Sequence, residues 1–121
     1  MRKILAMLAL SVSLLLQIAF GASAGEQQRV AAPQTVVIDV RTEAEWKAGH
    51  LEGAVLIPHD RIEQGITGVA PDKKTRIYLY CRTGRRTGLA LEALKKAGYQ
   101  DLVNLQTMEK ASQELKRHVV K

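Results

Sequence analysis

The chain has 121 residues, of which 46% are hydrophobic and 25% charged, and its formal net charge is +6. This length suits one domain, and the composition excludes collagen, coiled coil and wholesale disorder. A single cysteine excludes an intramolecular disulfide and a zinc site built from several thiolates. With one Trp, three Tyr and one Phe, the chain also lacks the aromatic platforms typical of nucleic-acid-binding proteins, so we expect no nucleic-acid partner.

The first 24 residues have the features of a secretory signal peptide. A short basic start precedes an apolar run over residues 4–20, and Ala22 and Ala24 have the spacing of a signal peptidase site. We expect cleavage after Ala24, a periplasmic location and membrane contact only through this segment, with a retained membrane anchor as the alternative. Residues 25–34 are polar and are predicted to form a linker before a domain over residues 35–121.

Four short apolar runs, the first of them rich in β-branched residues, predict strands in that domain. They cover residues 35–40, 54–57, 76–80 and 101–104. The run over 76–80 has large residues on both faces, so we expect it in the centre of the sheet. Because strands alternate with helical patterns, the fold class is predicted to be α/β, with a parallel sheet flanked by helices on both faces. In such sheets ligands bind at the carboxyl edge of the strands.

Helical patterns lie between and after these strands. Thr42 and Glu45 form a capping box that opens a helix over residues 43–48. A helical turn capped by Asp60 is expected to break at the glycines at 65 and 68. Two further helices are defined by their predicted core stripes: Leu89, Ala90, Ala93, Leu94 and Ala97 in the first, which Gly98 ends, and Met108, Ala111, Leu115 and Val119 in the second.

The cysteine lies where the predicted central strand meets the next helix. Residues 81–87 read Cys-Arg-Thr-Gly-Arg-Arg-Thr, and the glycine allows a tight turn. The amides of such a loop can face inward as an anion-binding nest, and the helix that begins near Arg86 adds the positive end of its dipole. Amides, dipole and the three arginines all favour thiolate over thiol. We therefore expect Cys81 to be an ionised nucleophile, open to water, that meets a small anion.

Segments 38–41, 45–46, 49–54, 56–58, 80–87 and 97–99 together resemble the rhodanese family of thiosulfate sulfurtransferases, in its single-domain, exported phage-shock type. The resemblance implies that Cys81 attacks the outer sulfur of thiosulfate, releases sulfite and carries a persulfide. Cyanide or a thiol then accepts that sulfur. No metal or cofactor is implied, and we expect a monomer. The predicted substrate-binding residues follow the cysteine: Arg82, Thr83, Gly84, Arg85, Arg86 and Thr87.

Other residues near the predicted site are expected to have supporting roles. Asp39 and Arg41 end the first strand at the same edge and are predicted to support the cysteine loop as an ion pair. His50 is expected to help fix a turn, and Trp46 to pack against the sheet. After Asn104 the chain lacks the glycine pair found in many family members, so the turn that forms one wall of the pocket is expected to differ.

Two other functions stay open at this point. One is a phosphatase or arsenate reductase of the related cysteine-loop class, and the other is a non-catalytic rhodanese-like binding module. The phosphatase signature has five residues between cysteine and arginine, whereas Cys81 and Arg86 enclose four, which favours sulfur transfer. The presence of Cys81 and its loop argues against the binding module.

Overall fold

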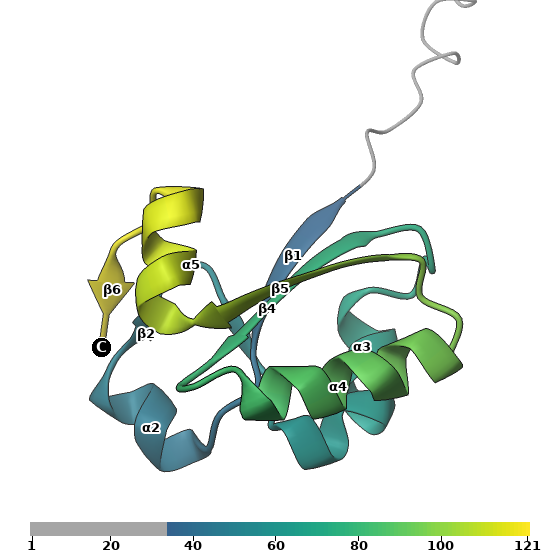
Figure 1. Ribbon diagram of the computed structural model, residues 1–121, viewed down its shortest axis with the longest axis horizontal. Helices are drawn as coiled ribbons and strands as arrows, with labels where there is room; N and C mark the ends of the chain where they lie inside the picture. The colour runs from purple at the N-terminus through teal and green to yellow at the C-terminus, as the bar shows by residue number, and fades with distance from the viewer. Residues whose placement is uncertain (1–33) are drawn as a thin grey trace, which may run out of the picture. The chain divides into compact units, whose positions relative to one another are not determined.

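The computed structural model describes residues 34–121 (Figure 1). The predicted signal peptide, and the predicted linker up to residue 33, lie outside the described residues. Within the described part, no helix has the length and apolar character needed to cross a membrane.

A four-stranded parallel sheet forms the centre of the domain (Figure 1). Its strand order is β3-β1-β4-β5, and every neighbouring pair is parallel. The strands are β1 (Thr35–Asp39), β3 (Val55–Leu56), β4 (Arg76–Cys81) and β5 (Asp101–Thr107). The four predicted strands are confirmed, and β4 lies inside the sheet as expected. Strand β3 is shorter than predicted and β5 is longer.

Helices cover both faces of this sheet, as predicted. Helices α3 (Ile62–Val69) and α4 (Arg85–Lys96) pack on one face, where Ile66 and Leu94 join the strand residues Ile38 and Leu79 in one apolar cluster. Helix α5 (Met108–Leu115) packs on the other, where Ala111 meets Val37 and Tyr80. Successive strand residues point to opposite faces, which is why neighbours such as Val37 and Ile38 belong to different clusters.

The capping box predicted at Thr42 is present at the start of α2 (Glu43–Ala48). The Thr42 hydroxyl accepts the backbone N–H of Glu45 at 3.2 Å, and the Glu45 carboxylate accepts the backbone N–H of Thr42 at 3.1 Å. This helix buries none of its side chains, so its start depends on the cap rather than on a packed face.

The prediction of a helical turn broken at two glycines is wrong. Helix α3 runs through Gly65 and Gly68, and a short 3-10 turn, η1 (His59–Arg61), precedes it. Asp60 lies inside that turn and caps nothing. The glycine at position 65 lets the Ile57 side chain pack against the helix, because a Cβ there would lie only 2.8 Å from that side chain.

The predicted core stripe of α4 is also partly wrong. Its buried residues are Thr87, Ala90 and Leu94, which recur at helical spacing. Leu89 is 50% exposed, and Ala97 is exposed as well, because both face away from the sheet. Gly98 follows the end of the helix, as expected, and its N–H donates to the carbonyl of Lys95 at 3.0 Å.

The last predicted helix is shorter than its pattern suggested. Helix α5 ends at Leu115 because Lys116 adopts a left-handed conformation with φ of 57°. Val119 therefore lies on no helix face; it belongs to β6 (Val119–Val120), which pairs antiparallel with β2 (His50–Leu51). Neither of these two-residue strands was predicted, since two residues show no periodicity.

Candidate active site

Cys81 is the last residue of β4, and the chain then turns directly into α4. Gly84 takes a left-handed φ of 99° at the N-cap position of α4, a conformation that favours glycine. Its amide donates to Cys81 Sγ at 2.9 Å, and Thr87 Oγ1 lies 3.9 Å from the same sulfur. The Thr87 hydroxyl donates to the carbonyl of Gly84 at 2.7 Å. The loop therefore closes around the sulfur through its own hydrogen bonds.

These contacts set the ionisation of the cysteine. Burial raises the pKa of the Cys81 thiol, but hydrogen bonds from the backbone amides of Thr87, Gly84 and Thr83 outweigh it, so the pKa lies below its ordinary value. Hydrogen bonds to the charged form favour that form. No side chain caps the start of α4, which leaves its first amides available to the sulfur.

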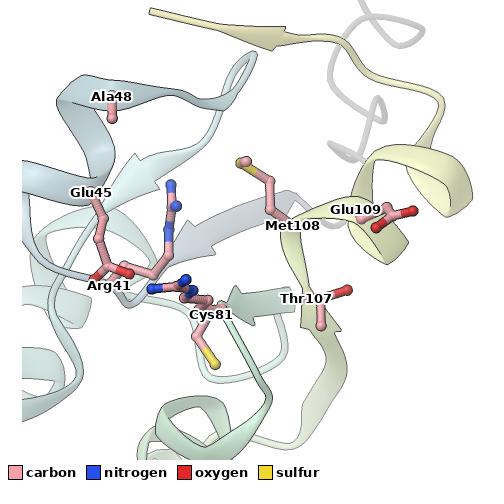
Figure 2. A pocket seen from close by; sticks show the side chains of 8 residues that line it. Arg41, Glu45, Ala48, Cys81, Thr107, Met108 and Glu109 are labelled. Atoms are coloured by element: carbon pink, nitrogen blue, oxygen red, sulfur yellow. The ribbon is translucent and has the colours of Figure 1, made fainter.

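The expectation that the Cys81 thiol is open to water is wrong. Cys81 is 0% exposed, because the loop that supplies its hydrogen bonds also wraps around it. It nevertheless lines a pocket of about 390 Å³ at the carboxyl edge of the sheet (Figure 2). The pocket is lined by residues from α2, from the carboxyl ends of β1, β4 and β5 and from the start of α5: Arg41, Glu45, Ala48, Cys81, Arg82, Thr107, Met108 and Glu109.

The three loop arginines do not form one cluster at the pocket. Arg82 lines it. Arg86 instead forms a two-point ion pair with Glu45 of α2, with Nη1–Oε1 and Nη2–Oε2 distances of 2.7 and 3.0 Å. Arg85 is exposed and is not among the lining residues. Of the three predicted arginines, the structure thus places only Arg82 among the residues that line the pocket.

Glu45 is a site residue that the sequence reasoning missed. The hydrogen bond from Arg86 is the main reason why the pKa of its carboxyl is lowered to about 2, against the ordinary 4.5. It therefore carries a full negative charge at neutral pH. The capping box explained Glu45 by a local role, and no local pattern pointed to a partner 41 residues away.

Asp39 and Arg41 form the ion pair that the sequence predicts at the end of β1. Asp39 is fully buried and Arg41 is 7% exposed. The guanidinium contacts the carboxylate at 2.9 Å (Nε–Oδ1) and 2.7 Å (Nη2–Oδ2), and its Nη2 also donates to the carbonyl of Gly49 at 2.7 Å. The pair therefore ties the end of β1 to the turn after α2, and it compensates the charge of an arginine that lines the pocket.

The opposite wall of the pocket is formed by the turn that lacks a glycine pair. A bulge at Leu105 shifts the register of β5 against β4. Gln106 then adopts a left-handed φ of 69°, and its N–H donates to Asn104 Oδ1 at 2.9 Å. Thr107 Oγ1 accepts the backbone N–H of Lys110 at 3.1 Å and so caps α5. The first turn of α5 follows at once, and Met108 and Glu109 are among the residues that line the pocket.

His50 and Trp46 form a structural unit beside the site. Their rings are stacked with centroids 3.5 Å apart, and His50 Nδ1 lies 2.9 Å from the carbonyl oxygen of Trp46. His50 thus holds the turn after α2, in keeping with the role expected for it. Trp46 stacks on His50 of β2 and is only half-buried, and it is not among the side chains of the two apolar clusters. In residues 34–121, no three His, Cys, Asp or Glu residues are grouped in a way that could hold a metal ion.

Known proteins resemble the chain in sequence and in fold. Residues 26–107 match the family model described as "Rhodanese-like domain". "Thiosulfate sulfurtransferase PspE" of Escherichia coli is 36% identical over 67 residues, which cover 55% of this chain and 64% of that protein. "Probable adenylyltransferase/sulfurtransferase MoeZ" of Mycobacterium tuberculosis is 49% identical over 72 residues, which cover 58% of this chain and 18% of that protein. The chain thus spans less than two thirds of either relative.

A solved structure shows the same fold. The structure titled "rhodanese with anions from E. coli" superposes with a TM-score of 0.65 and 30% identity, over 72% of this chain and 98% of that one. The α/β fold, the matched family model and the sulfurtransferase relatives agree with one another. The chain, with its single cysteine at the end of β4, therefore belongs to the rhodanese-like domain family.

Proposed function

We propose that the chain is a sulfurtransferase that moves a sulfane sulfur from thiosulfate, or a similar small anion, to cyanide or a thiol through a persulfide on Cys81. The observation that carries this proposal is the Cys81 sulfur, which accepts the Gly84 amide at 2.9 Å beside the pocket. Relatives named as sulfurtransferases support the reaction class. The E. coli structure named with anions supports a negatively charged donor.

The first half-reaction is a displacement at sulfur. The Cys81 thiolate attacks the outer sulfur of thiosulfate, a new S–S bond forms, the S–S bond of the donor breaks, and sulfite leaves with its electron pair. Arg82 lines the pocket and attracts the anion. The pocket, about 390 Å³, far exceeds the roughly 30 Å³ that one water occupies in the liquid, so a small anion fits. Because Cys81 has no exposed surface even toward the pocket, the loop or the pocket wall must move for the donor to reach the sulfur.

The second half-reaction returns the enzyme to its starting state. Cyanide or a thiolate attacks the outer sulfur of the persulfide, the bond to Cys81 breaks, and Cys81 leaves as a thiolate. The amides of Thr83, Gly84 and Thr87 that lower the thiol pKa stabilise this leaving group. One set of hydrogen bonds thus serves both displacements.

The position of Arg86 supports sulfur transfer over phosphate chemistry. Cysteine-loop phosphatases use an arginine to hold a tetrahedral oxyanion over the cysteine. Here both terminal nitrogens of Arg86 are engaged by Glu45 at 2.7 and 3.0 Å, so this guanidinium is not available to an oxyanion. Hydrolysis of p-nitrophenyl phosphate, assayed beside sulfur transfer, tests this alternative; a phosphatase rate lost in Cys81→Ser would favour it.

Mass spectrometry tests the proposed function directly. After incubation with thiosulfate and removal of the excess, the intact chain should gain the mass of one sulfur atom and release one equivalent of sulfite. Cys81→Ser should gain nothing, because a serine hydroxyl does not form a persulfide. Because the chain has one cysteine, this variant removes its only thiol. No gain by the wild type, or an equal gain by the serine variant, would contradict the proposal.

Export and monomeric state remain part of the proposal. Residues 1–24 would direct the chain to the periplasm and be removed after Ala24. Cell fractionation followed by N-terminal sequencing checks this: the exported protein should begin at Gly25. A chain that retains Met1 in the membrane fraction would instead indicate an anchor. Light scattering of the purified protein should give the mass of one chain.

A further inference from the structure

Some of the charged side chains that line the pocket are paired with an opposite charge, and others are not. Four charged side chains line it, and two of them have partners: Arg41 pairs with Asp39, and Glu45 pairs with Arg86. Arg82 and Glu109 form no ion pair within residues 34–121. A molecule that enters the pocket therefore meets one uncompensated cation beside the cysteine and one uncompensated anion on the α5 wall.

Glu109 lies across the pocket from α2. In Figure 2, Glu45 and Ala48 approach from one side, Thr107 and Glu109 come from the opposite side, and Cys81 lies between them. Glu109 is exposed and belongs to the first turn of α5. The family match ends at residue 107, so Glu109 comes from a part of the chain beyond that match. This placement suits a residue that selects among substrates rather than one that performs the shared chemistry.

We propose that Glu109 makes the pocket select small thiols that carry an ammonium group as sulfur acceptors. The proposal rests on the proposed sulfur transfer through Cys81. The acceptor thiolate attacks the outer sulfur of the Cys81 persulfide, forms a new S–S bond and releases the Cys81 thiolate, while its ammonium group lies toward the Glu109 carboxylate. An acceptor with a second negative charge is repelled by the same carboxylate.

A series of acceptors that differ in charge tests this preference. The persulfide is first loaded with thiosulfate and verified by intact mass, and its loss is then followed with cysteamine, 2-mercaptoethanol and thioglycolate. Glu109→Gln should lower the rate with cationic cysteamine about three- to tenfold, leave neutral 2-mercaptoethanol unchanged and raise the rate with anionic thioglycolate about threefold. The intrinsic reactivities of the three thiols differ, but they cancel when each thiol is compared between wild type and variant.

Two further variants separate selectivity from helix stability. An acidic residue in a first turn also interacts favourably with the helix dipole, so a purely structural role of Glu109 must be distinguished. Glu114 belongs to the same helix, pairs with Lys110 and does not line the pocket. Glu114→Gln should therefore leave all three rates unchanged. Glu109→Lys should reverse the preference. Equal changes with all three acceptors would overturn the proposal.

An alkylation ratio keeps this test separate from the proposed function. Iodoacetate is an anion and iodoacetamide is neutral, and both react with the unloaded Cys81 thiolate. Glu109→Gln should raise the iodoacetate-to-iodoacetamide rate ratio about threefold at low salt, and added salt should reduce this difference. An unchanged ratio would refute the electrostatic role of Glu109. Failure of persulfide loading with a changed ratio would instead refute the proposed sulfur transfer, while the electrostatic effect of Glu109 on the pocket would stand.

Discussion

The pocket is bordered by the starts of two helices that are built in different ways. Gly84 is the N-cap of helix α4, which has no side-chain cap, and the Gly84 amide donates to the sulfur of Cys81 at 2.9 Å. Thr107 is the N-cap of helix α5, and its hydroxyl accepts the amide of Lys110 at 3.1 Å. Both turns contain a left-handed residue just before the helix, Gly84 in one and Gln106 in the other. The two helix starts differ in the group that accepts hydrogen bonds from the first backbone amides.

This difference separates reactivity from selectivity. An uncapped helix start keeps its N–H groups for a partner outside the helix, and at α4 that partner is the sulfur. At α5 the cap uses one of these groups internally, so this helix contributes to the pocket mainly through its side chains, Met108 and Glu109. Changes at α4 should therefore alter the thiol, and changes at α5 should not.

The largest expected effect comes from the Asp39–Arg41 ion pair at the end of β1. Asp39→Asn should destabilise the fold by about 3–5 kcal/mol, because it leaves the buried guanidinium of Arg41 without its counter-charge. Urea unfolding measures this loss. Asp101→Asn breaks the exposed pair with Arg76 and should cost less than about 1 kcal/mol. Similar losses of unfolding free energy in Asp39→Asn and Asp101→Asn would contradict the burial of the Asp39–Arg41 pair.

Two glycines of α4 should respond in opposite directions. Gly84→Ala forces a side chain into a left-handed conformation and should cost about 1–2 kcal/mol, while displacing the amide that holds the sulfur. Gly88→Ala, inside the helix with nothing within 4 Å of the new Cβ, should stabilise by about 0.5–1 kcal/mol. Unfolding free energies and Cys81 alkylation rates check both. If the Cys81 thiol of Gly84→Ala kept the wild-type pKa, the Gly84 amide would not be a cause of the lowered pKa.

The cap of α5 tests the other side of the comparison. Thr107→Ala should cost about 1 kcal/mol through loss of the cap, and Thr107→Ser should restore most of it. Neither variant should move the pH midpoint of Cys81 alkylation. A shift as large as that of Gly84→Ala would show that the two helix starts are not independent.

The last effect concerns the Glu45–Arg86 pair and, unlike the others, appears only above acidic pH. Because the pKa of the Glu45 carboxyl is lowered from 4.5 to about 2 in the fold, the ionised pair stabilises the protein above pH 4.5, and this stabilisation is lost as the pH falls toward 2. Its size should be about 1 kcal/mol, since both side chains are partly exposed. Unfolding curves of wild type and Glu45→Gln should thus converge at low pH. A constant difference between them at all pH values would contradict the pairing.

The cysteine loop was predictable because its interactions are local. The hydrogen bonds that close it lie within residues 81–87, and the strand before it is apolar on both faces. The same holds for the Asp39–Arg41 pair, which is two residues apart. Local sequence therefore contained the nucleophile, the turn and the expected lowering of the thiol pKa, although not the enclosure of the thiol.

Features that depend on distant contacts were not predictable. Glu45 and Arg86 meet across 41 residues, and β6 pairs with β2 although nearly 70 residues separate them. The prediction that Leu89 of α4 lies in the core was wrong because a helix rich in Leu and Ala has more than one apolar face. The left-handed Gln106 gave no signal, since its residue type does not favour that conformation.

The pH dependence of Cys81 alkylation by iodoacetamide tests the central claim most directly. If inward-facing amides stabilise the thiolate, the midpoint in the folded chain lies below that of the same chain unfolded in urea, which should titrate near the value of about 8.5 for free cysteine. A folded midpoint equal to or above the unfolded one, or a folded thiol that does not react at any pH, would contradict the account.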